Sequence, residues 1–170
     1  MLDIIQHNPF RLIGVFSTAT RKEIVANLAR IKANIRVNRQ VSFPVDLDGI
    51  LPSPQRTAET IADAESKLAL PKDIIRYAQF WFIENTEIDK IAINNISVGA
   101  YDKAISIWEK KENLSSVHNR ILTFLIRGNY GKALELAFLF YGKYSFEFAQ
   151  LIWFFFNLVE KDMLHYHFSS

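Results

Sequence analysis

The sequence predicts an all-α protein. Apolar residues recur at the three- and four-residue spacing of a helix, and no segment alternates apolar and polar residues as a half-buried strand does. The composition is 49% hydrophobic and 14% aromatic, which provides enough apolar area for a packed core and excludes a disordered chain. The length of 170 residues fits one domain or two small ones that share a core.

The first long helix is predicted over residues 20–37. Thr20 and Glu23 have the spacing of a capping box, in which the hydroxyl and the carboxylate bond free backbone amides at the helix start. The apolar stripe of this helix consists of Ile24, Leu28, Ile31 and Ile35. Residues 38–54 contain three prolines and one glycine without periodicity, which predicts a loop.

Two further helices are predicted before residue 84. Ser53 and Pro54 have the pattern of an N-cap followed by proline at the first helical position, so a helix is expected from there to about Leu68. Pro71 starts the next one. Its inner face is predicted to hold Ile74, Tyr77, Ala78, Trp81 and Phe82.

The second half of the chain contains an internal repeat. Thr86 and Asp89 are expected to cap a helix over residues 86–97. Residues 99–105 are then echoed by residues 128–134, with glycine, tyrosine, lysine, alanine and an aliphatic residue in register. The second copy also follows a predicted helix, over residues 116–127. Each unit is therefore a helix–turn–helix hairpin that must stack on a neighbour to bury its apolar face.

The last predicted helix, over residues 145–161, is apolar on nearly every face. Such a helix is normally buried, so we expect it to pack into the last hairpin or against a partner, including a second copy of the chain. The abrupt end at Phe168-Ser169-Ser170 leads us to expect that the repeats continue in a longer protein.

The first half of the chain resembles the J-domain of DnaJ-type co-chaperones. The family's opening aromatic-x-x-Leu-Gly-Val is matched by Phe10, Ile13, Gly14 and Val15. Residues 19–24 are similar to the start of its second helix, and residues 64–77 are similar to its later Ala, Leu, Pro and Tyr positions. The resemblance implies a J-domain-like helical hairpin over residues 1–83, followed by tetratricopeptide-like repeats over residues 84–170.

One departure from the family bears on function. The His-Pro-Asp tripeptide, through which the family stimulates its heat-shock ATPase partner, would fall on Arg36-Val37-Asn38, and none of the three residues matches. The connecting loop also contains the apolar, proline-bearing residues 43–47. The resemblance therefore implies the fold and not the activity.

Two surfaces are candidates for binding a partner. Residues 1–41 carry seven lysines and arginines against two carboxylates, and the candidate basic face consists of Arg21, Lys22, Arg30, Lys32, Arg36 and Arg39. A solvated face, an acidic protein partner and nucleic acid all remain open for it, although no aromatic residues interleave to stack single strands. The candidate peptide groove of the hairpins consists of Tyr101, Trp108, Phe124, Tyr130 and Tyr141, and the alternative for these residues is core packing.

No catalytic, metal or cofactor site is predicted. The chain has no cysteine and no phosphate-binding loop, and His165 and His167 would lie on different faces of a helix. His118 and Asn119 are expected to cap or bridge helices. The N-terminus lacks the pattern of a secretory signal and the longest apolar run, residues 151–156, is too short to span a bilayer, so a cytoplasmic protein is expected.

The predicted function is a non-enzymatic protein–protein interaction or chaperone-related adaptor module. Two alternatives remain open: a co-chaperone that engages a heat-shock ATPase through a non-standard loop, and nucleic-acid binding through the basic helix.

Overall fold

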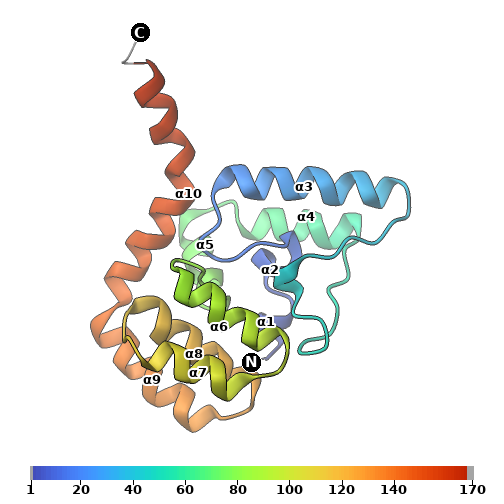
Figure 1. Cartoon of the computed structure of the whole chain (residues 1–170). Coiled ribbons are helices and arrows are strands. Elements are labelled where there is room, and N and C mark those ends of the chain that lie inside the picture. The colour runs from blue at the N-terminus through green and yellow to red at the C-terminus, as the bar shows by residue number, and fades with distance from the viewer. Residues whose placement is uncertain (1, 168–170) are drawn as a thin grey trace.

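The structure, a computed structural model, describes residues 2–167, with side chains as far as Asn157. Within residues 2–167 it contains helices and no strand, which confirms the all-α fold class (Figure 1). Phe168-Ser169-Ser170, on which we based the expectation of a longer protein, lie outside the described residues. None of the described helices is both long and apolar enough to cross a membrane.

The helices follow one another with short connections except after α3. Their bounds are α1 (Leu2–Gln6), α2 (Pro9–Ile13), α3 (Arg21–Arg36), the 3-10 turn η1 (Pro44–Asp46), α4 (Ala58–Lys67), α5 (Pro71–Ala78), α6 (Glu87–Ser97), α7 (Tyr101–Glu109), α8 (Leu114–Ile126), α9 (Tyr130–Lys143) and α10 (Ser145–His167).

In space, α3 and α4 lie side by side and antiparallel above the short α2, while α6–α7 and α8–α9 form two antiparallel hairpins below them (Figure 1). The last helix, α10, runs from the end of α9 past α5 and α3. Buried side chains from both halves of the chain belong to a single hydrophobic cluster.

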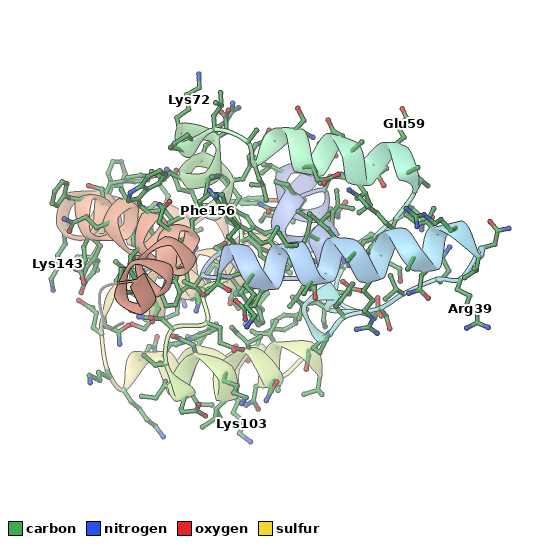
Figure 2. All side chains as sticks on the ribbon, turned by 90° about the horizontal axis from the view of Figure 1, so that it is seen from above. Arg39, Glu59, Lys72, Lys103, Lys143 and Phe156 are labelled. Atoms are coloured by element: carbon green, nitrogen blue, oxygen red, sulfur yellow. The ribbon has the colours of Figure 1, made fainter. Side chains whose placement is uncertain are left out.

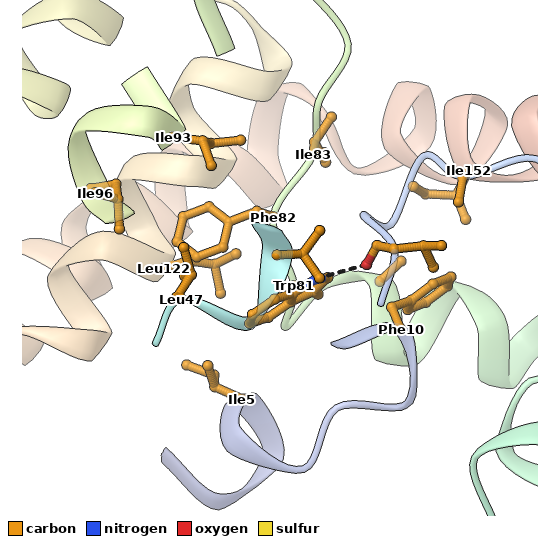
Figure 3. Close-up of a cluster of buried hydrophobic side chains, with 14 of the residues drawn as sticks. Ile5, Phe10, Leu47, Trp81, Phe82, Ile83, Ile93, Ile96, Leu122 and Ile152 are labelled. Carbon is orange, nitrogen blue, oxygen red and sulfur yellow. Dashed lines mark hydrogen bonds between the residues drawn. The ribbon is translucent and has the colours of Figure 1, made fainter. Parts of the chain in front are cut away.

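The centre of this cluster is the segment that joins the two halves. Trp81, Phe82 and Ile83 are all fully buried among side chains from α1, α2, α6, α8 and α10 (Figure 3). The indole N–H of Trp81 donates a hydrogen bond to the backbone oxygen of Val15 at 3.0 Å. Trp81 and Phe82 were predicted on the helix that starts at Pro71, but α5 ends at Ala78, so they occupy the connection that follows it.

The start of α3 is as predicted. Thr20 is the N-cap: its side-chain oxygen accepts from the backbone N–H of Glu23, and the Glu23 carboxylate accepts from the backbone N–H of Thr20 at 2.7 Å. The two side chains thus satisfy two amides that have no partner within the helix.

The predicted start of the next helix is wrong. α4 begins at Ala58 and not at Pro54, because Thr57 caps it by accepting from the backbone N–H of Thr60. The residue before this cap, Arg56, has its side chain buried in the core. Residues 54–57 are not helical, and this non-helical backbone precedes the cap.

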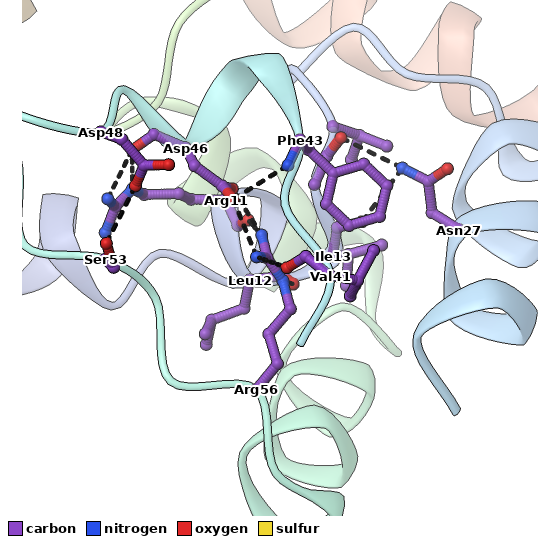
Figure 4. Close-up of polar contacts among 12 residues, drawn as sticks. Arg11, Leu12, Ile13, Asn27, Val41, Phe43, Asp46, Asp48, Ser53 and Arg56 are labelled. Atoms are coloured by element: carbon purple, nitrogen blue, oxygen red, sulfur yellow. Dashed lines mark hydrogen bonds and ion pairs between the residues drawn. The ribbon is translucent and has the colours of Figure 1, made fainter. Parts of the chain in front are cut away.

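The long α3–α4 connection is ordered by a buried ion pair (Figure 4). The Asp46 carboxylate accepts two hydrogen bonds from the Arg56 guanidinium, at 2.5 and 2.9 Å, and one from the backbone N–H of Phe43. Arg56 also donates to the backbone oxygens of Arg11, Leu12 and Val41. These bonds fix residues 41–56 on α2, which explains how a segment of this length without a long helix stays in place.

A second cationic side chain supports the same connection. Arg11 is 1% exposed and donates to the backbone oxygens of Gln6, Asp46 and Pro52. Burial lowers the pKa of its guanidinium, and the nearby Asp46 carboxylate acts in the opposite direction.

The ring of Phe43 is held between this network and Gly14. The guanidinium carbons of Arg30 and Arg56 lie 5.0 and 4.9 Å from the centre of the ring. Gly14 has a left-handed backbone (φ +80°), and a β-carbon at this position would overlap the Phe43 ring. Asn27 donates to the backbone oxygen of Gly14, so α3 is tied to the same point.

Alanine at position 14 is expected to lower the free energy of unfolding by about twice as much as alanine at position 128. Gly128 is also left-handed (φ +74°) but has open space around its α-carbon, so Gly128→Ala costs only the backbone strain, about 1 kcal/mol. Gly14→Ala adds the displacement of a packed ring. Urea denaturation of both variants measures the difference, and equal losses would show that the ring moves aside freely.

Candidate protein-docking surface

The two hairpins share one turn geometry, 29 residues apart. Gly99 and Gly128 both have positive φ, +77° and +74°. The backbone N–H of Ala100 donates to the oxygen of Asn95 at 2.9 Å, and that of Asn129 donates to the oxygen of Phe124 at 2.8 Å. The sequence echo thus corresponds to a recurring helix–turn–helix unit. The helix before the second turn begins at Leu114, two residues earlier than predicted, because Asn113 caps it.

The interior of the first hairpin, α6–α7, is closed. Trp108 is fully buried, and its indole N–H donates to the Asp89 carboxylate at 3.0 Å. Since α8 packs against α7, the prediction that Trp108 lines a groove is wrong, and the alternative of core packing holds. Phe124 is buried for the same reason. Tyr101 is half-buried, with the Arg127 guanidinium 5.3 Å from its ring centre.

The second hairpin, α8–α9, has an open apolar groove. A cavity of about 300 Å³ lies between α8, α9 and the Gln79-Phe80 connection, and its lining is almost wholly apolar. We call this the α8–α9 groove, and its main lining residues are Ile121, Leu125, Tyr130, Leu134, Ala137 and Tyr141. Two of the predicted groove residues, Tyr130 and Tyr141, therefore lie at one cavity, whereas Tyr101 and Trp108 do not.

The outer face of α9 beside the groove is unusually apolar. Tyr130, Leu134, Phe138 and Tyr141 follow one another at helical spacing and are all exposed, Phe138 to 72%. On α10, Phe146, Trp153 and Phe154 are exposed as well. Apolar side chains that are exposed side by side, as those of α9 are, mark an interaction surface more often than isolated surface hydrophobics do.

The floor of the groove contains a histidine that sequence reasoning placed only as a helix cap or bridge. His118 is buried, its Nε2 lies 2.9 Å from the backbone oxygen of Trp81, and its ring stacks on Phe148 at 5.2 Å between centres. Burial lowers the pKa of His118 to about 4, so the ring is neutral at pH 7. A neutral ring has a single N–H, and the Trp81 oxygen beside Nε2 favours the tautomer that carries the proton there.

The neighbouring Asn119 also bridges, as expected. Its side-chain oxygen accepts from the backbone N–H of Ile83 at 2.9 Å, and its amide nitrogen donates to the backbone oxygen of Ile83 at 2.8 Å. His118 and Asn119 together fasten α8 to the segment that joins the two halves of the chain.

The last helix is only partly covered. Phe148 and Ile152 are buried, and α10 packs on α5 and α3 as well as on the last hairpin, where the Phe148 ring lies 5.2 Å from that of His118 and 5.5 Å from that of Phe140 between centres. The prediction that α10 packs into the last hairpin or against a partner is therefore met in part, because the helix also contacts the first half of the chain, which was not predicted. No described residue of α10 is among those that line the α8–α9 groove.

The six cations of the candidate basic face are exposed on α3 and just beyond its end, where Figure 2 labels Arg39. The Arg30 guanidinium lies over Phe43, Lys32 forms an ion pair with Glu65 at 2.8 Å, and Arg21 lies 4.7 Å from the ring centre of Phe156. Lys22, Arg36 and Arg39 make no ion pair within the described part of the chain. The cations do not form a continuous stripe, which weakens the case for a phosphate backbone as their ligand.

Among the described residues, no three histidine, aspartate or glutamate side chains gather as a metal ion would require. The side chains of His165 and His167 are outside the described set.

No protein-family model, no curated protein and no solved structure matches this chain. The interpretation of its surfaces therefore rests on their own geometry.

Proposed function

We propose that this chain is a non-enzymatic protein-interaction module that holds its partner in the α8–α9 groove. The observation that carries the proposal is the open apolar cavity lined by exposed Leu134 and Tyr141, beside the exposed Phe138 of the same helix. Protein–protein interfaces combine an apolar buried core with a polar, solvent-accessible rim. At this rim the Tyr141 hydroxyl donates to the Gln79 side chain at 3.0 Å.

The first half is, in this proposal, a J-domain-like scaffold without ATPase-stimulating activity, and the hairpins are tetratricopeptide-like. The short α2, the antiparallel α3 and α4 and the shorter α5 support the likeness. The absence of His-Pro-Asp at Arg36-Val37-Asn38 supports the loss of activity. The role that follows is that of an adaptor in a chaperone-related assembly.

A second candidate is a co-chaperone that reaches a heat-shock ATPase through a non-standard loop. The observation in its favour is the exposure of Arg36, Val37 and Asn38 at the end of α3, where Val37 is 61% exposed. Arg36 and Arg39 are available there for an acidic partner surface.

Capture of partners from cells with the tagged full chain separates the two candidates. Leu134→Ser is expected to reduce the captured partner about ten-fold, because it removes an apolar contact at the groove. Val25→Ser is the matched control, since Val25 and Leu134 are both 59% exposed and Val25 lies on α3, away from the groove.

Arg36→Ala tests the second candidate in the same experiment. If the unaltered chain and Leu134→Ser both capture a heat-shock ATPase and Arg36→Ala does not, the result would favour the co-chaperone. If all four proteins capture the same set, or the unaltered chain captures nothing above background, the groove is not a docking site.

A further inference from the structure

The two hairpins differ at one position that decides whether the interior is filled. With the 29-residue offset, Trp108 of α7 corresponds to Ala137 of α9, and Asp89 of α6 corresponds to His118 of α8. In the first hairpin the indole of Trp108 fills the interior and bonds Asp89. In the second hairpin the corresponding side chain is a methyl group.

Ala137 and His118 both line the cavity of the α8–α9 groove, so the absence of an indole at position 137 contributes to its space, while Phe140 and Phe148 pack against His118. Its volume of about 300 Å³ is ample for an aromatic ring, given that an apolar cavity of about 150 Å³ binds benzene. The cavity is open to solvent, and its lining residues Tyr130, Leu134 and Tyr141 are exposed, so a side chain can enter from outside.

The first hairpin also shows what kind of element covers the surface of α7 that corresponds to the exposed face of α9. There the cover is α8, a helix that is buried on nearly every face between its neighbours. As a result Ile105 is only 8% exposed, whereas its counterpart Leu134 is 59% exposed. The second unit presents the same type of surface without the covering helix.

The chemistry of the missing helix can be read from the polar contacts of α8. Its Arg120 lies 3.9 Å from the Glu109 carboxylate and 4.0 Å from that of Glu112. Glu109 is the last residue of α7, and its counterpart on α9 is the exposed Phe138, whereas Glu112 lies beyond the end of α7 in the connection to α8. A helix on the second unit therefore meets an aromatic ring where α8 meets the Glu109 carboxylate, which favours an apolar side chain in place of the arginine.

We infer that the α8–α9 groove binds an amphipathic helix of another protein, which inserts one aromatic side chain of about indole size beside Ala137. The inference rests on the proposed function and specifies its partner. The inserted ring takes the place that Trp108 fills within the first hairpin, and the apolar face of the helix covers Leu134 and Phe138.

The probe is a capped, fluorescently labelled peptide with the sequence of residues 113–127, which form the covering helix of the first hairpin and its caps. One version carries Arg120→Trp and the other Arg120→Ala. In fluorescence anisotropy with the full chain, the tryptophan peptide is expected to bind about 30-fold more tightly, the effect of one buried anchor residue.

The matched protein variants are Ala137→Trp and Ala137→Ser. Ala137→Trp fills the cavity from within and is expected to abolish binding of the tryptophan peptide, while its melting temperature stays at or above that of the unaltered chain. Ala137→Ser keeps the cavity open and is expected to bind the peptide nearly as well. If Ala137→Trp fails to fold, competition by free indole for the tryptophan peptide on the unaltered chain gives the same information.

Equal binding of the two peptides, or binding that survives in a folded Ala137→Trp, would overturn the inference. A dimer in sedimentation velocity that Ala137→Trp dissociates would overturn it in favour of a second copy of the chain. If Leu134→Ser reduces capture of the partner from cells but Ala137→Trp does not, the partner inserts no aromatic ring beside Ala137. That result would contradict this inference and still agree with the proposed interaction role.

Discussion

Replacement of Asp46 by alanine is expected to lower the free energy of unfolding by about 3–5 kcal/mol, because it leaves a buried cation without its counterion. The side chains of Asp46 and Arg56 are each 2% exposed, and two hydrogen bonds join them. The second buried guanidinium, that of Arg11, bonds the backbone oxygen of the same aspartate. Without the carboxylate, two cations remain in the same low-dielectric region.

Urea denaturation followed by circular dichroism measures this loss. Asp48→Ala is the matched control: Asp48 lies two residues away in the same connection but is exposed, its carboxylate accepts from the Ser53 hydroxyl, and it attracts the Arg11 guanidinium less than Asp46 does. Its replacement is expected to change the free energy of unfolding by less than about 0.5 kcal/mol. Similar losses in the two variants would show that the Asp46–Arg56 pair does not hold the connection in place.

The sequence indicates α3 well because the signals that form it are local. Thr20 and Glu23 are three residues apart, and the apolar stripe repeats within the helix itself, so both can be read without knowing the rest of the fold. The connection after α3 is different. Its prolines exclude a helix, but the ion pair that orders it joins residues ten positions apart, and its other bonds reach back to α2.

Arg11 shows that the number of charged residues in a segment does not give the charge on its surface. We counted it among the cations that make the first 41 residues basic, yet it is one of the most deeply buried large side chains in the described structure. Nothing in the local sequence distinguishes a buried arginine from a solvated one, because its partners are backbone oxygens supplied by the tertiary fold. The external charge of this half is therefore smaller than composition indicates.

For the candidate site, the sequence indicated the right hairpins but not which one is open. Trp108 and Tyr130 are both aromatic residues near a repeat turn, and composition alone does not separate core from groove. The discriminating signal was present in the repeat itself, since Trp108 aligns with Ala137 and a lost indole leaves space. The path of α10 could not be foreseen, because a helix that is apolar on nearly every face does not specify its neighbour.

Lowering the pH from about 7 to about 4 is expected to remove about 3 kcal/mol of stability through His118 alone. Burial lowers the pKa of His118 to about 4, against about 6.5 in the unfolded chain. The folded state therefore favours the neutral ring. The stability that this ring contributes is complete above the unfolded pKa and is lost as the pH falls from there towards the folded pKa.

His118→Gln isolates the contribution of the histidine. The glutamine retains a neutral N–H donor for the Trp81 oxygen, and the variant keeps all of the carboxylates, including the nearby Asp89. Urea denaturation of both proteins at several pH values measures the difference. The expected result is a free energy of unfolding that decreases by about 3 kcal/mol more in the unaltered chain than in the variant. Parallel pH profiles would mean that the ring between Phe140 and Phe148 becomes protonated without cost, and hence that α8 separates readily from the Trp81 segment.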